Sequence, residues 1–175
     1  APLSVREGPG WKAVTVPYAG RASAMTVIIP AVGEDFDIDP PALLAEIVPR
    51  LGDAAEPSLV ALSMPAFAID SPLGGIQKLG GTSLFEPGVD LFPMSDDPDG
   101  RPLRVDSLHQ RTVVRVDASG TSLAEGTVQG ADPEATPSTD ATPFVVAGPF
   151  AFVIHDTATG IPLIVGWQRE APTPN

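Results

Sequence analysis

The sequence predicts an α+β fold in which antiparallel strands predominate and helices are few and short. The 175 residues include 21 prolines and 17 glycines, a composition that favours many short strands and turns. Apolar and polar residues alternate from Leu103 to Asp117, as they do in a half-buried strand. Two apolar segments, 144–154 and 161–167, are predicted to be the strands of a hairpin, joined by a turn that ends in Gly160. No linker or internal repeat divides the chain, so we expect one domain over residues 1–175.

Composition and charge exclude several classes of partner. The chain carries 10 basic and 22 acidic residues, and its formal net charge of -12 repels nucleic acid and anionic lipid. It contains no cysteine, so neither disulfides nor thiolate-bound metals are expected. No apolar run approaches the length that crosses a bilayer. We therefore expect no nucleic-acid partner, no membrane partner and no cofactor.

The first part of the chain is predicted to be a loose lead-in followed by a hairpin. Residues 1–10 have no clear pattern and are assigned to the lead-in. Residues 11–17 and 23–29 have the composition of strands, and the turn residues around Gly20 separate them. The second of these strands is too apolar to have a solvent-facing side, so both of its faces should be covered.

Two helix starts and an interrupted strand follow. Asp39 and the two prolines after it predict a helix that continues, with apolar residues at helical spacing, to Gly52. Residues 59–69 are typical of a strand that is bent or interrupted at Pro65. A second cap-and-proline pair, Ser71-Pro72, predicts a short helix that ends near Leu79.

The alternating strand from Leu103 to Asp117 leads into a long segment without a core pattern. Residues 128–143 have few large apolar side chains and are rich in Pro, Thr, Asp and Ala. Such a segment cannot bury enough surface to offset its ordering entropy, so it should be exposed. In the strand itself, one face carries Leu108, Thr112, Val114 and Val116, and the other carries His109, Arg111, Val113 and Arg115.

Most sequence motifs of known catalytic sites are absent. Of the two histidines, His109 lies in mid-strand, where a histidine typically forms a hydrogen-bonded lock between neighbouring strands. His155 stands beside Asp156 and is expected to form a solvent-exposed pair in a turn. A Ser-His-Asp triad with Ser63 or Ser107 is conceivable, yet the chain has no G-x-S-x-G sequence. We expect the protein not to be an enzyme.

Motifs for metal or phosphate binding are also incomplete. Asp96, Asp97 and Asp99 resemble part of a calcium loop but lack the closing glutamate of an EF-hand, so a surface turn is the better interpretation. Two glycine pairs, at 74–75 and 80–81, lack the G-x-x-x-x-G-K-[ST] spacing of a phosphate loop. No metal site is predicted.

Four segments in the same order resemble the C-terminal half of a serpin, including its reactive-centre loop. They cover residues 11–30, 60–95, 103–121 and 144–166, which is nearly all of the chain from Trp11 onward. The resemblance implies a serpin-like fold of mostly antiparallel β-sheets with a few short helices, incomplete relative to a whole serpin. The positions that match the family's pattern are Pro65, Phe67, Leu73, Leu79, Gly80, Phe85, Asp90, His109, Pro149, Phe150 and Gly166.

The resemblance implies a serine-type endopeptidase inhibitor that acts as a suicide substrate. In serpins an exposed loop, here about residues 121–143, offers a peptide bond to a serine protease, which forms an acyl-enzyme. Before hydrolysis the cut loop inserts into the main β-sheet and carries the enzyme with it. The resemblance also implies secretion to the extracellular space.

The family's loop pattern assigns a hinge and a reactive bond. Gly120 and Thr121 fall on the hinge, and Thr121, Leu123, Glu125 and Thr127 would share one face after insertion. The family's spacing from the hinge places the reactive bond between Glu134 and Ala135, within a window from Pro133 to Ser138.

The residues around this bond imply a class of target protease. Glu134 suits a glutamyl-specific protease, whereas Ala135 or Thr136 suits an elastase- or subtilisin-like enzyme. Residues 121–143 contain neither arginine nor lysine, which argues against a trypsin-like target.

The hinge departs from the family pattern in ways that support an alternative function. Ala118 replaces the family's glutamate, and Leu123 and Glu125 interrupt the usual run of small residues. A buried, unpaired Glu125 carboxylate would cost several kcal/mol and would stall insertion. The alternative is a non-inhibitory serpin-like binding or structural module whose loop is merely cleaved. An unrelated β-rich enzyme or adhesion domain is a third interpretation.

The chain is also shorter than a whole serpin. The missing N-terminal half of the domain supplies most of the helices and several strands of the main sheet, so it is an implied partner together with the target protease. Taken alone, residues 1–175 should expose unpaired strand edges and apolar faces.

Overall fold

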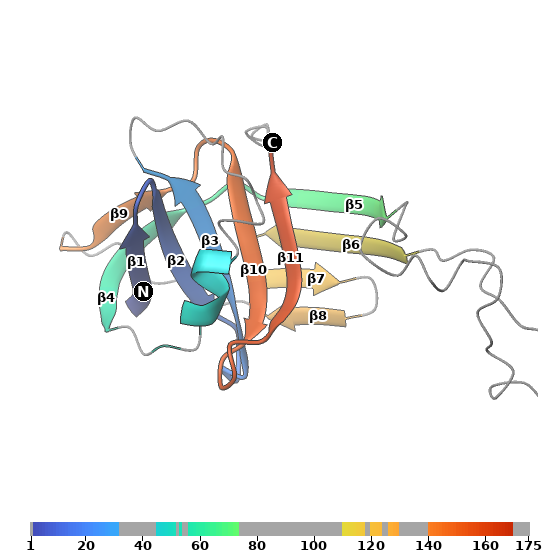
Figure 1. Ribbon diagram of the computed structural model, residues 1–175, viewed down its shortest axis with the longest axis horizontal. Helices are drawn as coiled ribbons and strands as arrows, with labels where there is room; N and C mark the ends of the chain where they lie inside the picture. The colour runs from blue at the N-terminus through green and yellow to red at the C-terminus, as the bar shows by residue number, and fades with distance from the viewer. Residues whose placement is uncertain are drawn as a thin grey trace, which may run out of the picture. The chain divides into compact units, whose positions relative to one another are not determined.

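The computed structural model describes residues 2–31, 45–51, 53, 56–73, 110–117, 120–123, 126–129 and 140–169 (Figure 1). Two compact units are present, one formed by Ala1–Phe67 with Arg115–Asn175 and the other by Ala68–Val114. Within the described part of the chain, no helix is long and apolar enough to span a membrane.

The first unit is built on a seven-stranded sheet with the order β11-β10-β3-β2-β1-β4-β9. Neighbouring strands pair antiparallel, except that β4 and β9 pair in parallel. The strands are β1 (Pro2–Gly8), β2 (Trp11–Pro17), β3 (Ser23–Pro30), β4 (Pro57–Ser63), β9 (Thr142–Val145), β10 (Phe150–Asp156) and β11 (Pro162–Gln168).

A second sheet has four strands in the order β5-β6-β7-β8. They are β5 (Phe67–Leu73), β6 (Gln110–Asp117), β7 (Gly120–Leu123) and β8 (Gly126–Gln129). The predicted two faces of β6 are confirmed over its described side chains, because Val114 and Val116 are buried while Arg111 and Arg115 are exposed. His109 and the earlier residues of the predicted strand lie outside the described residues.

The assignment of residues 1–10 to a loose lead-in is wrong. Pro2–Gly8 form β1, which pairs with β2 along one edge and with β4 along the other. Only Leu3 of this strand is fully buried, so its apolar pattern is weak. The strand is held by backbone pairing on both edges, which a pattern of side chains does not reveal.

The predicted hairpin of β2 and β3 is confirmed, and so is the interruption at Pro65. Trp11 stands opposite Pro30 and Pro17 opposite Ala24 in the hairpin. Residues 64–66 separate β4 from β5. The central residues of β3 are buried, as the lack of a polar face in its sequence indicated.

The helix predicted to begin at Ser71 is wrong at its start, because Ser71–Leu73 belong to β5. The cap-and-proline signal is local, whereas β5 is fixed by its neighbour β6. Near this point Arg111 of β6 donates two hydrogen bonds to the Asp70 carboxylate, at 2.8 and 2.5 Å. Residues 74–79 of the predicted helix lie outside the described residues.

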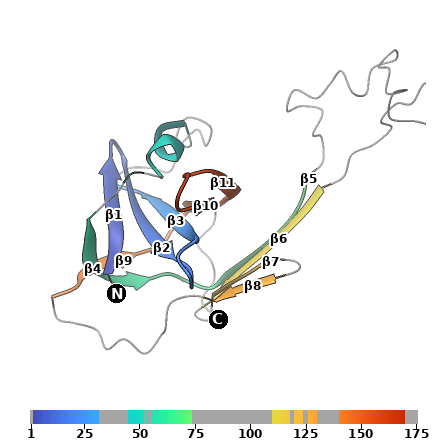
Figure 2. The same cartoon turned by 90° about the horizontal axis from the view of Figure 1, so that it is seen from below.

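One helical segment covers a face of the seven-stranded sheet (Figure 2). Residues 45–47 are α-helical, and η1 (Val48–Arg50) continues them as a 3-10 turn that contains Pro49. Arg6 of β1 donates to the carbonyl groups of Arg50 and Asp53, which ties the end of this segment to the sheet. Residues 39–44 of the predicted helix lie outside the described part of the chain.

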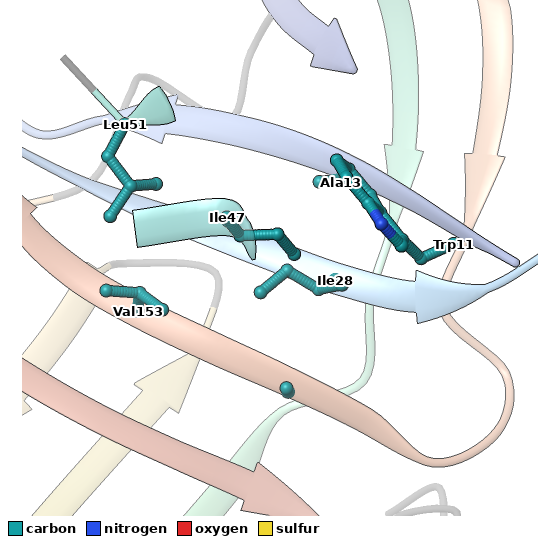
Figure 3. Close-up of a cluster of buried hydrophobic side chains, with 7 residues drawn as sticks. Trp11, Ala13, Ile28, Ile47, Leu51 and Val153 are labelled. Atoms are coloured by element: carbon teal, nitrogen blue, oxygen red, sulfur yellow. The ribbon is translucent and has the colours of Figure 1, made fainter. Parts of the chain in front are cut away.

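The core lies on both faces of β10. On the side of the helical segment, Ala151 and Val153 are part of a cluster of buried residues (Figure 3). On the other side, the ring of Phe67 packs edge-on against Phe150, with ring centroids 5.1 Å apart, and against Phe152 at 5.4 Å. The other members of the first cluster are Trp11, Ala13, Ile28, Ile47 and Leu51.

The strand predicted over residues 144–154 is in fact two strands. β9 ends at Val145 and β10 begins at Phe150, and the residues between them include Gly148 and Pro149. Proline has no N–H to contribute to a ladder, which explains the break. The hairpin of β10 and β11 is confirmed, and its turn is fixed by Asp156, whose carboxylate accepts from the Thr159 amide and hydroxyl at 2.8 and 2.6 Å.

The expected solvent-exposed pair at His155 and Asp156 is also corrected. His155 is only 2% exposed and lies at the end of β10, not in the turn. Its Nε2 atom shares a hydrogen bond of 3.1 Å with the hydroxyl of Thr26, which in turn lies 2.8 Å from the hydroxyl of Thr15. This row of polar side chains crosses β2, β3 and β10, and it is buried at Thr26 and His155 and part-buried at Thr15. Burial, together with the charge of Arg6, lowers the pKa of His155.

Gly166 of β11 is required by the ring that packs against it. A methyl group added there would lie 2.6 Å from Cζ of Phe152, a ring held among other buried aromatic residues. We expect Gly166→Ala to lower the free energy of unfolding by about 1–3 kcal/mol, as overpacking of a core does. Gly148→Ala is the matched control, since nothing lies within 4 Å of its added methyl group. Equal effects in a denaturant titration would contradict this account.

The buried imidazole of His155 makes stability depend on pH. Because its pKa is lower in the folded than in the unfolded state, the unfolded state binds the proton first as the pH falls below about 6.5. Stability should therefore fall between pH 7.5 and 5.5 in the natural sequence, and fall less in His155→Gln. Denaturant midpoints across this range provide the measurement, with His109→Gln as the control. Parallel curves for His155→Gln and the natural sequence would refute the assignment.

Candidate functional site

The candidate site is the segment that leaves β6 and returns at β9, with its two ends fixed in different sheets. The front end is β7, the neighbour of β6, and the far end is β9, an edge strand that pairs in parallel with β4. Just after β9, the amide of Val146 donates to the carbonyl of Ser63 at 2.8 Å. The segment is therefore anchored before and after the residues that the sequence assigns to the reactive bond.

The front end begins with a backbone conformation that glycine provides. Gly120 has a φ of 142°, a value that residues with a side chain rarely adopt. The strand β7 starts there and pairs antiparallel with β8, so that Thr121 stands opposite Val128 and Leu123 opposite Gly126. The hinge assigned to Gly120 and Thr121 therefore lies in a β-sheet.

Thr121 is buried and hydrogen-bonded. Its side chain is 1% exposed, and its hydroxyl accepts a hydrogen bond of 2.7 Å from the Tyr18 hydroxyl. Tyr18 follows β2, and its ring is buried too. Burial raises the pKa of the Tyr18 phenol, and the hydrogen bond to Thr121 partly opposes that rise. The phenol is therefore protonated and able to donate at physiological pH.

The turn that carries Tyr18 is well defined by backbone hydrogen bonds. The Tyr18 amide donates to the Ser23 carbonyl at 3.0 Å, and the Arg21 amide donates to the Tyr18 carbonyl at 2.9 Å. Gly20 and Arg21 both have positive φ values, 81° and 57°, as this tight reversal requires. The phenol is thus presented from a fixed point at the end of the β2–β3 hairpin.

The structure describes only some of the residues that the sequence assigns to the site. Gly120, Thr121 and Leu123 lie in β7, and Thr127 lies in β8. Glu125, Ala118, the reactive bond at Glu134 and Ala135, and the proposed lock His109 lie outside the described residues. Tyr18 was not a sequence-based candidate. Its position in the Pro-Tyr-x-Gly turn gave no sign of a contact 103 residues away.

The described part of the chain holds no group of three or more His, Cys, Asp or Glu side chains that could bind a metal ion. What the described parts of this region offer instead is strand-forming backbone that is paired in a sheet at each end, in β7 and in β9.

Comparisons with known proteins agree with this architecture. The family model "Serpin (serine protease inhibitor)" matches residues 2–169. The wheat (Triticum aestivum) protein Serpin-Z2A is 27% identical over 93% of this chain, and the human Protein Z-dependent protease inhibitor is 26% identical over 86% of it. The aligned regions are 43% and 33% of those two proteins, so the chain spans less than half of their length.

Solved structures show the same fold. The native state of tengpin, a thermophilic serpin, superimposes with a TM-score of 0.71 at 23% identity, and the match covers 95% of this chain and 43% of tengpin. Thyroxine-binding globulin in complex with thyroxine gives a TM-score of 0.72 at 13% identity, with the same coverage. The fold class expected from the sequence is confirmed, as a part of the serpin fold. On the family model and these relatives, the chain belongs to the serpin family.

Proposed function

We propose that this chain is the reactive-loop half of a serpin domain that inhibits a serine protease as a suicide substrate. Membership of the family supports inhibition in general. The observation that carries the proposal is the state of the hinge, because Thr121 is buried in a strand next to β6. A loop whose front end already occupies a sheet position is prepared to add further residues to that sheet.

In the proposed reaction the protease acts as it does on any peptide. Its catalytic serine oxygen bonds to the carbonyl carbon of Glu134, the bond between Glu134 and Ala135 breaks, and the Ala135 nitrogen leaves with a proton. Insertion of the loop beyond β7 then competes with the water that would hydrolyse the ester. The role of this chain is to present the bond and to insert, and it supplies no catalytic group.

The proposed target is an elastase-, subtilisin- or glutamyl-type serine protease. The residues on either side of the proposed bond, Glu134 and Ala135, carry this assignment, together with the lack of arginine and lysine in 121–143. The proposed location is extracellular, where such proteases act on secreted proteins. Neither nucleic acid nor membrane is a proposed partner, because of the net charge of -12.

The second proposed partner is the missing N-terminal half of the serpin domain. β11 is an edge strand, and one of its faces is apolar and open, with Leu163 61% and Trp167 41% exposed. Val165 lies between them on the same face, opposite the buried Val153 of β10. A strand of this composition at a sheet edge requires a covering segment.

A specific observation favours the alternative, a non-inhibitory module whose loop is merely cleaved. β8 occupies the side of β7 away from β6, so the chain after Leu123 is engaged in a second pairing. The hinge sequence adds three departures from the family pattern: Ala118 stands in place of a glutamate, and Leu123 and Glu125 interrupt the run of small residues. These features would slow insertion relative to hydrolysis.

Incubation with proteases tests the two functions. The protein in its natural full-length form should give an SDS-stable covalent adduct with an elastase-, subtilisin- or glutamyl-type enzyme, and none with trypsin as the control. If the bond assignment is right, mass spectrometry should show that the released peptide begins at Ala135. Cleavage without an adduct would instead support the non-inhibitory module.

Glu125 offers a test of the hinge. If its carboxylate has to enter the sheet, Glu125→Ala should raise the fraction of protease trapped per cleaved inhibitor several-fold, since desolvation of the charge is avoided. Asp132→Ala is the control, a loop carboxylate closer to the reactive bond. An unchanged trapping fraction in Glu125→Ala would mean that this side chain does not enter the buried face.

The open face of β11 predicts self-association of residues 1–175 produced alone. Replacing Leu163 by Gln and Val165 by Thr should shift the population toward monomer in sedimentation velocity, because it removes apolar area while keeping a strand-compatible sequence. Thr142→Gln is the control, as it changes an exposed polar residue on the opposite edge strand. A monomeric natural sequence at the same concentration would argue against an uncovered apolar edge.

A further inference from the structure

The hydrogen bond between Tyr18 and Thr121 joins two parts of the chain that the sequence separates widely. The Tyr18 hydroxyl lies 2.7 Å from Oγ1 of Thr121, and both side chains are buried. Tyr18 stands at the end of the β2–β3 hairpin, and Thr121 is the second residue of β7. The contact therefore fixes the start of the proposed loop to the seven-stranded sheet.

This contact is important for the stability of β7 because the side chains of both Tyr18 and Thr121 are buried. If β7 left the sheet, the phenol would remain on its turn without the threonine oxygen as acceptor. A buried hydroxyl left unpaired is unfavourable, because its desolvation is no longer offset by a hydrogen bond. The bond therefore favours the state in which this four-residue strand stays in the sheet.

The same contact also defines a register. Because the Tyr18 phenol binds the hydroxyl of Thr121, Thr121 is the residue of the loop that lies beside the end of β2. Gly120, immediately before it, supplies the φ of 142° that brings the chain into line with this point. A slip by one residue would turn the Thr121 side chain to the other face of β7 and break the bond.

We propose that the Tyr18 hydroxyl is a latch that holds Gly120–Leu123 in the four-stranded sheet before cleavage, and so sets how much of the loop is free to reach a protease. This inference rests on the proposed function only for its consequence in inhibition. Tyr18 is a positioning residue in this account. It acts on the hinge and touches neither the reactive bond nor the protease.

Hydrogen exchange at the hinge tests the latch in the full-length protein without any protease. In Tyr18→Phe, which keeps the ring, amide exchange in the peptide that covers residues 120–123 should rise about tenfold. Thr121→Val should give the same rise, and the double variant no more than either, because both remove one shared bond. Thr121→Ser keeps the hydroxyl and should retain most of the natural protection.

Thr15→Val is the control for the loss of a hydrogen-bonded hydroxyl elsewhere, here a part-buried one. It breaks the pair formed with Thr26, at 2.8 Å, in the seven-stranded sheet. Its effect on exchange at residues 120–123 should be small. If Tyr18→Phe does not fold, the comparison of Thr121→Val with Thr121→Ser decides the question. Unchanged protection of residues 120–123 in Thr121→Val or Tyr18→Phe would overturn the latch.

The consequence for inhibition is measured separately. In Tyr18→Phe the loop should be cleaved faster and the fraction of protease trapped as adduct should fall, because the hinge would have to return to the sheet before insertion could proceed. Should the natural protein form no adduct at all while exchange still responds to Tyr18→Phe, the proposed function fails and the latch stands. Should adducts form while exchange does not respond, the latch fails and the proposed function stands.

Discussion

The fold depends on burying both faces and both edges of β10. Its side chains alternate between the cluster under the helical segment, with Ala151 and Val153, and the aromatic contact of Phe150 and Phe152 with Phe67. β3 and β11 pair with its two edges, so its backbone groups are satisfied as well. This constraint dictates the residues around it. The clearest case is Gly166, where any side chain would meet the ring of Phe152.

Much of this architecture could be predicted because its central strands have strong patterns. The strands of the β2–β3 hairpin, the break at Pro65 and the two faces of β6 follow from alternation and from proline. Two errors have a common cause. β1 pairs with the distant β4 as well as with the adjacent β2, and β5 lies beside the distant β6, whereas the residues of β1 and of the end of β5 have the local pattern of a coil or a helix start. Local signals do not contain that information.

The polar contacts were predicted less well than the strands. His155 was assigned to a turn beside Asp156, but its imidazole contacts the hydroxyl of Thr26, 129 residues away in the sequence. Tyr18 and Thr121 are a similar case. Resemblance to a family picked out Thr121, and only the three-dimensional arrangement shows the phenol opposite it. A sequence identifies hydroxyl and imidazole groups, whereas their partners are set by which strands become neighbours.

The arrangement of β6, β7 and β8 defines what insertion would have to overcome. β7 lies between β6 and β8, so both of its edges are paired. For residues after Leu123 to extend along β6, β8 must first leave β7, and the ladder from Gly120–Gln129 to Leu123–Gly126 must open. The latch at Thr121 would keep the first residues in register while that exchange takes place. Whether the protein inhibits or is merely cleaved would then depend on two rates, that at which this short ladder opens and that at which water hydrolyses the acyl-enzyme.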